Sequence, residues 1–428
     1  MLRLPTENTS DREEKTMAEW QTVRLGEIVK TNQSTYSPKE NWQFVNYLDT
    51  GNITMNKIDE IQNINTDKDK LPSRARRKVK TNSIIYSTVR PNQLHYGIIK
   101  KQPDNFLVST GFTVIDVNYD KAVPDFIYYA LTKQEVTEQL QAIAEQSVSA
   151  YPSLKPSDIE NLELMLPDKK TQERIVAILR SIDEKIKENN AINNNLEQQA
   201  QALFKKWFID NPENVDWSAG TFRELIQSTL NGDWGKEAPT GNNTEKVYCI
   251  RGADIPEVKA GNKGKMPTRY ILPKNLANKK LEAGDIVVEI SGGSPTQSTG
   301  RCTAITQSLL DRYDSSMVCT NFCKAIKPKN GYSLFVYYYW QYLYEKGVFF
   351  SYENGTTGIK NLDFTGFIET EPIIVPTFDK VQAFDDYCKS IFNQVFANGK
   401  QSEQLASLRD TLLPKLMSGE LDVSNIEL

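Results

Sequence analysis

The sequence predicts an α+β protein: two similar mixed α/β globular domains separated by two long antiparallel helices, which form an intramolecular coiled coil with pseudo-twofold symmetry. The first observation is a heptad pattern of apolar residues between Lys169 and Phe208, uninterrupted by proline or glycine. The second is a similar pattern after Pro376, and the third is an ordered repetition of short segments. Heptads sustained over several turns are typical of a long helix that pairs with another. At about 1.5 Å per residue, the first helix could span roughly 60 Å.

The two heptad patterns each predict a seam of residues spaced by three or four positions, with polar residues in the middle. In the first helix the predicted seam includes Ile175, Leu179, Ile182, Ile186, Asn189, Asn193, Leu196 and Leu203. In the second helix it includes Phe384, Ile391, Val395, Asn398 and Leu405. Buried polar residues at a seam cost stability but can fix register and orientation. The alternative is that the asparagines are exposed where the helices diverge. Pro414 is expected to kink or end the second helix.

Five segments recur in the same order in the second half of the chain. WQTVRLGEIV from Trp20 is echoed by WSAGTFRELI from Trp217, SIIYSTVRP from Ser83 by DIVVEISGGSP from Asp285, and DFIYYALT from Asp125 by LFVYYYWQYL from Leu334. Two further pairs keep the order, at offsets of roughly 200 residues, which indicates internal duplication. The predicted divisions are a polar extension (1–19), a first domain (20–167), a long helix (168–210), a second domain (211–376) and a distal helix with a tail (377–428).

Periodicity within the first domain predicts its main elements. Residues 83–89 and 112–117 alternate like strands, and residues 125–132 and 134–144 have helical spacing. The first helix should stop at the Asn211-Pro212 break. The N-terminus lacks the apolar core of a signal peptide, Met17 is an alternative start, and no apolar run approaches ~18 residues. We therefore expect a cytoplasmic protein.

Catalytic and metal-binding patterns are incomplete in this sequence. His95 is the single histidine, which excludes a multi-histidine metal centre and leaves a Ser-His-Asp triad only formally possible. The five cysteines include a C-x-x-x-C pair, Cys319 and Cys323, but no second pair or histidine lies nearby, so buried reduced thiols are expected. There is no P-loop and no G-x-G-x-x-G. We expect no catalytic residue and no metal ligand.

Charge distribution points to nucleic acid more than net charge does. The formal net charge is −4, but residues 68–80 and 257–280 each hold seven basic residues and one acidic residue, just before the duplicated strands. Such paired basic runs suit phosphate contact, and nearby Arg, Asn and Gln side chains can read base edges. The DNA-binding candidates are Arg74, Arg76, Arg77, Lys78, Lys80, Arg90, Asn92, Gln93, Lys263, Lys265, Arg269, Gln297 and Arg301. The aromatic run 335–344 could stack on bases, but packing in a core helix is the favoured interpretation.

Three segments carry a family resemblance. LPDKKTQERIVAILRSIDEKIKENNAINNNLEQQAQALFKKWFID, from Leu166, resembles the central conserved region of the specificity (S) subunits of type I restriction-modification enzymes. LRDTLLPKLMSGEL, from Leu408, resembles the end of their distal conserved region, and MAEWQTVRLGEI, from Met17, resembles their opening. With the duplication, the resemblance covers nearly the whole chain.

The resemblance implies a non-catalytic subunit that reads double-stranded DNA. Each globular domain would be a target recognition domain for one half of a bipartite site, and the helices would set the spacer between the halves. Two methylation (M) subunits using S-adenosylmethionine would dock on the chain, and restriction (R) subunits using ATP and Mg would join them; no cofactor is expected in this chain. The rival interpretations are a non-DNA scaffold with two protein-binding heads and, less favoured, a self-contained enzyme.

Overall fold

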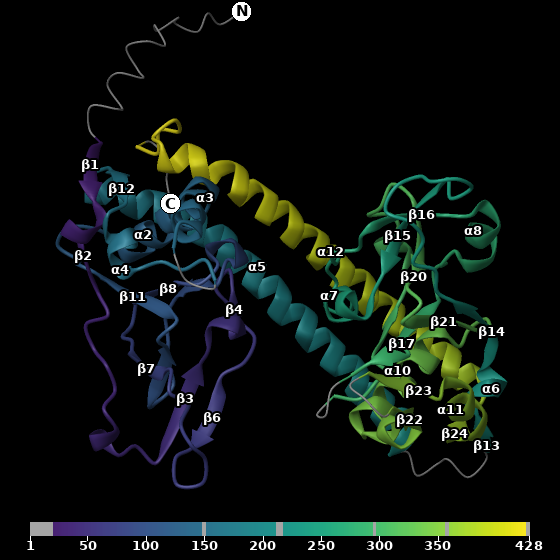
Figure 1. Cartoon of the computed structure of the whole chain (residues 1–428). Helices are drawn as coiled ribbons and strands as arrows, with labels where there is room; N and C mark the ends of the chain where they lie inside the picture. Colours follow the sequence, from purple (N-terminus) through teal and green to yellow (C-terminus); the bar gives the residue numbers. More distant parts are fainter. Residues whose placement is uncertain (1–19, 148–150, 211–216, 294–296, 356–358, 425–428) are drawn as a thin grey trace, which may run out of the picture. The chain divides into compact units, whose positions relative to one another are not determined.

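The computed structural model describes residues 20–147, 151–210, 217–293, 297–355 and 359–424 (Figure 1). It contains two compact units, one of residues 1–183 with 407–428 and one of Glu184–Ala406. Each unit holds one globular domain and the adjoining lengths of both long helices, and each is described by itself. The expected N-terminal extension, the alternative start at Met17 and the Asn211-Pro212 break lie outside the described residues.

Two four-stranded sheets form the first domain. The first sheet is antiparallel with the order β2-β11-β8-β9, and the second has the order β6-β3-β10-β7, in which β3 and β10 are parallel. A separate antiparallel pair, β1 with β12, joins the start of the domain to its end. The strands are β1 Gln21–Arg24, β2 Val29–Thr31, β3 Phe44–Leu48, β4 Ile53–Thr54, β5 Lys57–Ile58, β6 Gln62–Asn65, β7 Ala75–Lys78, β8 Ile84–Ser87, β9 Tyr96–Ile98, β10 Phe106–Ser109, β11 Phe112–Val117 and β12 Glu163–Leu166.

Helices pack with the first of these sheets into the main core of this unit. The helices are α2 Pro124–Leu131, α3 Gln134–Glu145 and α4 Pro156–Glu160, together with the short 3-10 turns η1 Leu25–Glu27, η2 Pro38–Glu40, η3 Thr50–Asn52 and η4 Pro91–Gln93. Proline opens α2 and α4, a position where its missing N–H costs no helical hydrogen bond. Their apolar faces pack with Ile175 and Leu179 of the first long helix and with Leu416 and Met417 of the second. The predicted elements at 83–89, 112–117, 125–132 and 134–144 are present to within two residues.

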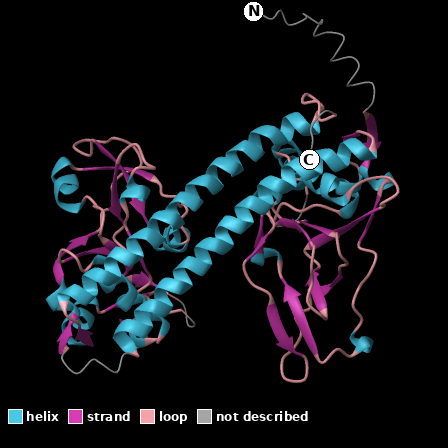
Figure 2. Cartoon of the chain, turned by 180° about the vertical axis from the view of Figure 1, so that it is seen from behind, coloured by secondary structure: helices cyan, strands magenta, loops and turns pink. Residues whose placement is uncertain are grey.

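The second domain repeats this arrangement. Its strands are β13 Ser218–Thr221, β14 Ile226–Asn231, β15 Glu245–Ile250, β16 Thr268–Ile271, β17 Ile286–Glu289, β18 Ser291–Gly292, β19 Cys302–Ala304, β20 Ser316–Cys319, β21 Cys323–Pro328, β22 Glu353–Asn354, β23 Lys360–Leu362 and β24 Pro372–Val375. Its helices and short turns are α6 Phe222–Leu225, η7 Gly252–Asp254, α7 Ile255–Lys259, α8 Pro273–Lys279, α9 Gln307–Leu310, α10 Ser333–Glu345, η8 Val348–Tyr352 and α11 Phe364–Thr370. In each unit the strands belong to the globular domain and none lies on a long helix (Figure 2).

Strand pairing confirms the internal duplication. The sheet order β14-β21-β17-β19 matches β2-β11-β8-β9, and β15 pairs with β20 in parallel as β3 pairs with β10. The terminal pair β13 with β24 matches β1 with β12. The expectation that the two basic runs occupy equivalent places holds in the sequence but not in the sheets. The first run contains β7, which pairs with β10, whereas the second contains β16, which pairs with β15.

The long helices are α5 Lys169–Phe204, continued by a π-helical turn η5 Lys205–Ile209, and α12 Phe378–Met417. Within the second unit they are antiparallel, since Asn189 contacts Asn398 and Ser402 while Asn193 contacts Val395. Within the first unit the antiparallel order continues with an ion pair between Asp183 and Arg409. The fold class predicted from the heptads and the repeat is therefore confirmed at the level of each unit.

Two details of the helices differ from expectation. Pro414 lies inside α12, which continues to Met417, because a proline three residues before the end removes only one backbone hydrogen bond. At the end of α5 the most buried side chains are Phe204 and Phe208, while Leu203 is only half-buried. The two phenylalanines pack against Phe335 and Phe384, so the aromatic core of the domain rotates the buried face by one residue.

The aromatic run 335–344 belongs to that core, as expected. It lies in α10, where Trp340 is fully buried, donates its indole N–H to the Gly300 carbonyl at 2.8 Å and contacts Phe349 and Phe367. All five cysteines are buried and free, and burial raises the pKa of Cys249 and of Cys302 to about 12. In the described part of the chain, no helix is long and apolar enough to cross a membrane.

Candidate nucleic-acid interface

The seam asparagines occupy the centre of a polar contact between the long helices of the second unit. Asn189, Asn193, Asn398 and Ser402 are all buried, so the alternative in which they are exposed is wrong. Asn398 donates to the Asn193 carbonyl oxygen at 2.8 Å, and Asn189 donates to Ser402 Oγ at 3.2 Å. These bonds require one alignment of α5 with α12, because an unpaired buried amide is costly.

The same seam also holds a loop of the second domain, which we call the docking loop (residues 260–263, directly after α7). The Asn193 amide donates to the Ala260 carbonyl at 3.1 Å, and Arg312 Nη1 donates to the Gly261 carbonyl at 2.7 Å. The close approach depends on Gly399 of α12, since a Cβ there would lie 1.9 Å from the Gly261 carbonyl oxygen. The heptad pattern identified the asparagines but not this third partner; the glycine within a long helix was the available signal.

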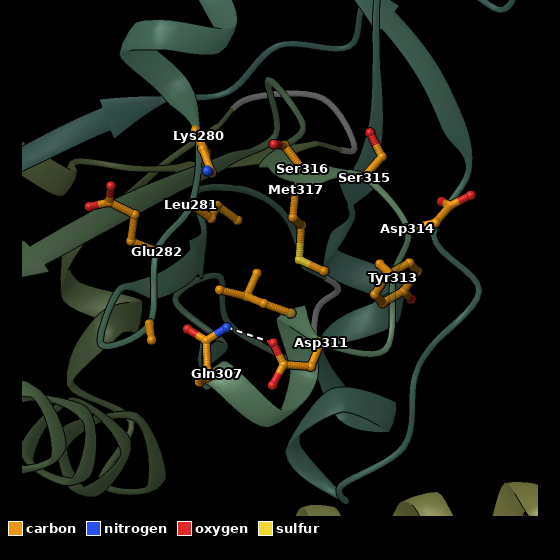
Figure 3. Close-up of a pocket in the computed structure, with 12 residues that line it drawn as sticks. Lys280, Leu281, Glu282, Gln307, Asp311, Tyr313, Asp314, Ser315, Ser316 and Met317 are labelled. Atoms are coloured by element: carbon orange, nitrogen blue, oxygen red, sulfur yellow. Dashed lines mark hydrogen bonds between the residues drawn. The ribbon is translucent and has the colours of Figure 1, made fainter.

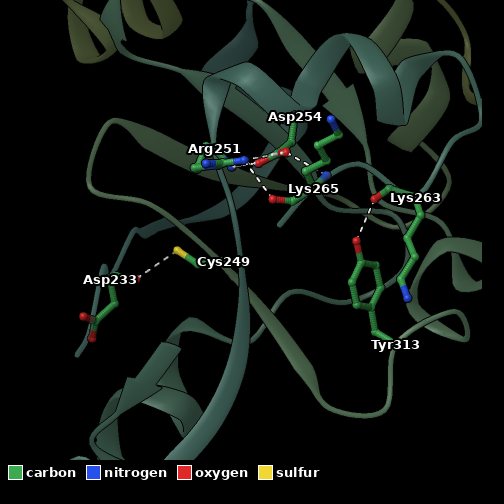
Figure 4. A network of polar contacts seen from close by, with 7 residues as sticks. All are labelled: Asp233, Cys249, Arg251, Asp254, Lys263, Lys265 and Tyr313. Atoms are coloured by element: carbon green, nitrogen blue, oxygen red, sulfur yellow. Dashed lines mark hydrogen bonds and ion pairs between the residues drawn. The ribbon is translucent and has the colours of Figure 1, made fainter. Parts of the chain in front are cut away.

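The docking loop lies within the second basic run, and a polar network fixes that run in place (Figure 4). Asp254 accepts from the Arg251 guanidinium at 2.9 and 3.1 Å and from the Lys265 backbone N–H at 3.0 Å. The Lys263 ammonium lies 4.5 Å from the centre of the Tyr313 ring, while the Tyr313 hydroxyl donates to the Lys263 carbonyl at 2.6 Å. Lys265 is exposed and Lys263 half-buried.

The other candidates in the second domain are engaged within the protein. Arg269 is buried, pairs with Glu237 at 3.1 Å, and its guanidinium carbon lies 3.7 Å from the centre of the Trp234 ring. Arg301 makes two 2.8 Å hydrogen bonds to Glu289, and this ion pair raises the Arg301 pKa. Gln297 is half-buried. These arginines therefore have fewer donors to offer a ligand than their sequence position suggests.

The first basic run is spread over both faces of β7. Arg76 and Arg77 are adjacent strand residues, so their half-buried side chains point to opposite faces. Burial lowers the pKa of Arg77. Lys78 pairs with Glu40 and lies 5.1 Å from the centre of the Trp42 ring, and Lys80 lies 3.5 Å from Asp116. Only part of this run is therefore available to phosphate.

The remaining candidates of the first domain are exposed. Arg74 lies against the turn between β10 and β11, where its carbonyl accepts from Thr110 at 2.8 Å and its guanidinium adjoins Gly111. Arg90, Asn92 and Gln93 are exposed in and beside η4. The Arg90 guanidinium carbon lies 4.9 Å from the centre of the Tyr151 ring, a partner that no sequence motif indicated.

A pocket of about 630 Å³ in the second domain is the largest hollow that bears on these candidates (Figure 3). Lys280, the end of the second basic run, lines it together with Glu282, Asp311 and Asp314. Gln307 donates to the Asp311 carboxylate at 2.7 Å. Three carboxylates against one ammonium make this pocket unfavourable for a DNA phosphate. In the described residues no group of three His, Cys, Asp or Glu side chains could hold a metal.

Comparison with known proteins adds the family context. Residues 17–198 match the family described as Type I restriction modification DNA specificity domain. The chain is 27% identical to the type I restriction enzyme HindI specificity subunit of Haemophilus influenzae, over 95% of this chain and 100% of that protein. It is 25% identical to the MjaIX specificity subunit of Methanocaldococcus jannaschii, over 77% of this chain and 76% of that protein. These matches confirm the class that the motifs predicted, a specificity (S) subunit of type I restriction-modification enzymes.

A solved structure supports the fold independently. The S subunit of a type I restriction-modification system from M. genitalium aligns with a TM-score of 0.53 and 16% identity, over 97% of this chain and 98% of that one. At this identity the likeness concerns the fold alone. It agrees with two sheet-rich domains and long helices in a single chain.

Proposed function

We propose that this chain is the DNA sequence-specificity subunit of a type I restriction-modification complex, in which each globular domain reads one half of a bipartite site. The observation that carries the proposal is the duplicated domain, strand for strand, in a chain that aligns with the whole of a curated specificity subunit. Two copies of one scaffold in one chain suit a target made of two different halves. A non-DNA scaffold with two protein-binding heads is not favoured, because the family match is to a DNA specificity domain.

The chemistry of methylation and cleavage belongs, in this proposal, to partner subunits. Two M subunits would bring S-adenosylmethionine, and R subunits would bring ATP and Mg. This chain would act without catalysis, by holding duplex DNA in register for an M subunit that flips out its target adenine. The single histidine and the lack of a P-loop in the sequence support a recognition role.

Methylome sequencing tests the main proposal. Cells that carry this chain with its M subunit should show methylated adenines in one bipartite motif, and cells with the M subunit alone should not. The absence of any motif that depends on this chain would overturn the proposal. A gel shift with the purified complex separates DNA recognition from the scaffold alternative.

The two long helices would set the spacer between the half-sites. Inserting one heptad into each helix keeps the seam in phase and lengthens each helix by about 10 Å. The methylated motif should then have a longer spacer and unchanged half-sites. The same residues appended after Leu428 are the control and should change neither. An altered half-site with an unchanged spacer would contradict the role of the helices.

A further inference from the structure

Three loops meet in the first domain and form what we call the three-loop surface of domain 1 (residues 88–93, 110–111 and 151–154). Thr88 is at its centre, since its backbone N–H donates to the Gly111 carbonyl at 2.8 Å and its carbonyl accepts from the Leu154 N–H at 2.7 Å. A bridge between Val89 and Ser153 continues the contact. The three loops are therefore held by backbone bonds, independently of their outward side chains.

The second domain builds the same junction from the equivalent segments, the three-loop surface of domain 2 (residues 290–293, 321–322 and 359–362). The Ile290 N–H donates to the Phe322 carbonyl at 2.9 Å, and its carbonyl accepts from the Leu362 N–H at 2.8 Å. Ser291 pairs with Asn361 as Val89 pairs with Ser153. Each backbone contact of the first surface thus has a counterpart in the second.

These two surfaces carry the most exposed large apolar side chains in the described part of the chain. Tyr151, Phe322 and Ile359 are each 58% exposed. Exposed apolar side chains that recur at one place on a duplicated scaffold indicate a contact with a partner. In domain 1 they are joined by the exposed Arg90, whose backbone has φ +49°, a left-handed conformation that is strained for arginine and characteristic of functional sites.

The side chains of the two surfaces differ although the backbones match. The strand register and the hydrogen bonds place Arg90 opposite Gly292, Gly111 opposite Phe322, and Tyr151 opposite Ile359. A partner that is the same for both domains would favour similar side chains at both places. Two different half-sites would favour different ones, on a scaffold that stays constant.

We propose that the three-loop surfaces are the base-reading surfaces of the two domains, with different chemistry in each. In domain 1, Arg90, Asn92 and Gln93 form hydrogen bonds with purine edges, since Arg matches guanine and Asn or Gln match adenine in the major groove. The Tyr151 ring holds the Arg90 guanidinium in place, and Arg74 beside Gly111 contacts the flanking phosphate.

In domain 2 the same site reads its half-site by apolar contact. Phe322 and Ile359 lie where a thymine methyl can be recognised, and Lys360, which pairs with Glu353 at 2.8 Å and lies 4.9 Å from the centre of the Phe350 ring, borders them. This assignment rests on the proposed function, because it names the residues by which each domain would read DNA.

The test uses the purified complex of the full chain with its M subunit and a duplex library randomised in both half-sites. Arg90→Ala should lower discrimination at a purine of one half-site about tenfold or more and leave the other half-site unchanged. Phe322→Ala should relax a thymine preference in the other half-site only. Lys101→Ala and Tyr119→Ala, exposed in domain 1 outside the surface, are the matched controls and should change neither half-site.

The outcomes separate the inference from the proposed function. Unchanged preferences in both variants, with a wild type that selects a bipartite site, would overturn the base-reading assignment and leave the proposed function standing. Variants that lose the M subunit but keep their base preferences would make the surface a protein-docking site instead. A wild-type complex that selects no sequence would overturn the proposed function itself.

Discussion

Gly399→Ala tests how the second domain is fixed to the helix pair. The new Cβ would lie 1.9 Å from the Gly261 carbonyl oxygen and 2.6 Å from its carbon, both rigid backbone atoms. Restoring an ordinary contact requires the docking loop to move by roughly 1.5 Å, because carbon and oxygen repel steeply below about 3.4 Å.

Such a displacement breaks the hydrogen bonds that hold the docking loop. Asn193, Arg312 and Glu403 bond to its backbone at 3.1, 2.7 and 3.2 Å, respectively. Each bond contributes about 1 kcal/mol net, so their loss costs about 3 kcal/mol. Alanine is better than glycine within a helix by about 1 kcal/mol, which leaves a net destabilisation of about 2 kcal/mol.

Hydrogen exchange of residues 260–263, together with thermal unfolding of the full chain, measures the effect. Gly399→Ala should speed exchange in the docking loop and lower the melting temperature. Asn393→Ala, at an exposed position of the same helix, should do neither. A rise in melting temperature with unchanged exchange would mean that helix propensity dominates, and would refute the role of close packing.

Three further substitutions follow from the polar contacts. Burial raises the pKa of Asp385 from 3.8 to about 6, so the folded state binds its proton more tightly than the unfolded state does. The stabilisation linked to that proton is complete below about pH 4 and is lost as pH rises to about 6, on the order of 3 kcal/mol; Asp385→Asn should flatten this part of a stability–pH curve, and an unchanged curve would contradict the assignment. Asp183 accepts from Arg409 at 2.9 Å and from the Tyr129 hydroxyl at 2.7 Å, so Asp183→Asn should cost about 1–2 kcal/mol in urea unfolding, against no loss for Glu184→Gln on the exposed side of the helix. Reversing the whole first basic run would also perturb its half-buried arginines, so Arg74→Glu is the cleaner change; it should weaken DNA binding and reduce the salt slope by about 0.9 per phosphate lost, and an equal slope in a salt titration would exclude phosphate contact.

The sequence was sufficient wherever periodic patterns act locally. Strand alternation and helical spacing depend on which side chains face the core, so they placed the strand at 112–117 and the helices at 125–132 and 134–144 correctly. The duplication could also be read from the chain, because two copies of one fold must repeat the same order of elements. Family resemblance came from the long helices, whose motifs extend over many residues.

Charge runs were a weaker guide, because a sequence does not show which charges the fold consumes. Arg269 and Arg301 were equal candidates with Arg90 until Glu237 and Glu289 were found beside them. Partners of this kind come from residues distant in the chain or on neighbouring strands, and side-chain direction is set by the pairing of strands.

The heptads of residues 169–208 and of the distal segment determined by themselves that two long helices pair, since an apolar stripe must be buried against another. Only the tertiary structure decided what the asparagines in that stripe contact. Asn193 bonds to the other helix and to the docking loop together, and Gly399 makes room for that loop. The reason is that buried amides need partners in three dimensions, and those partners come from a loop for which the heptad pattern has no term.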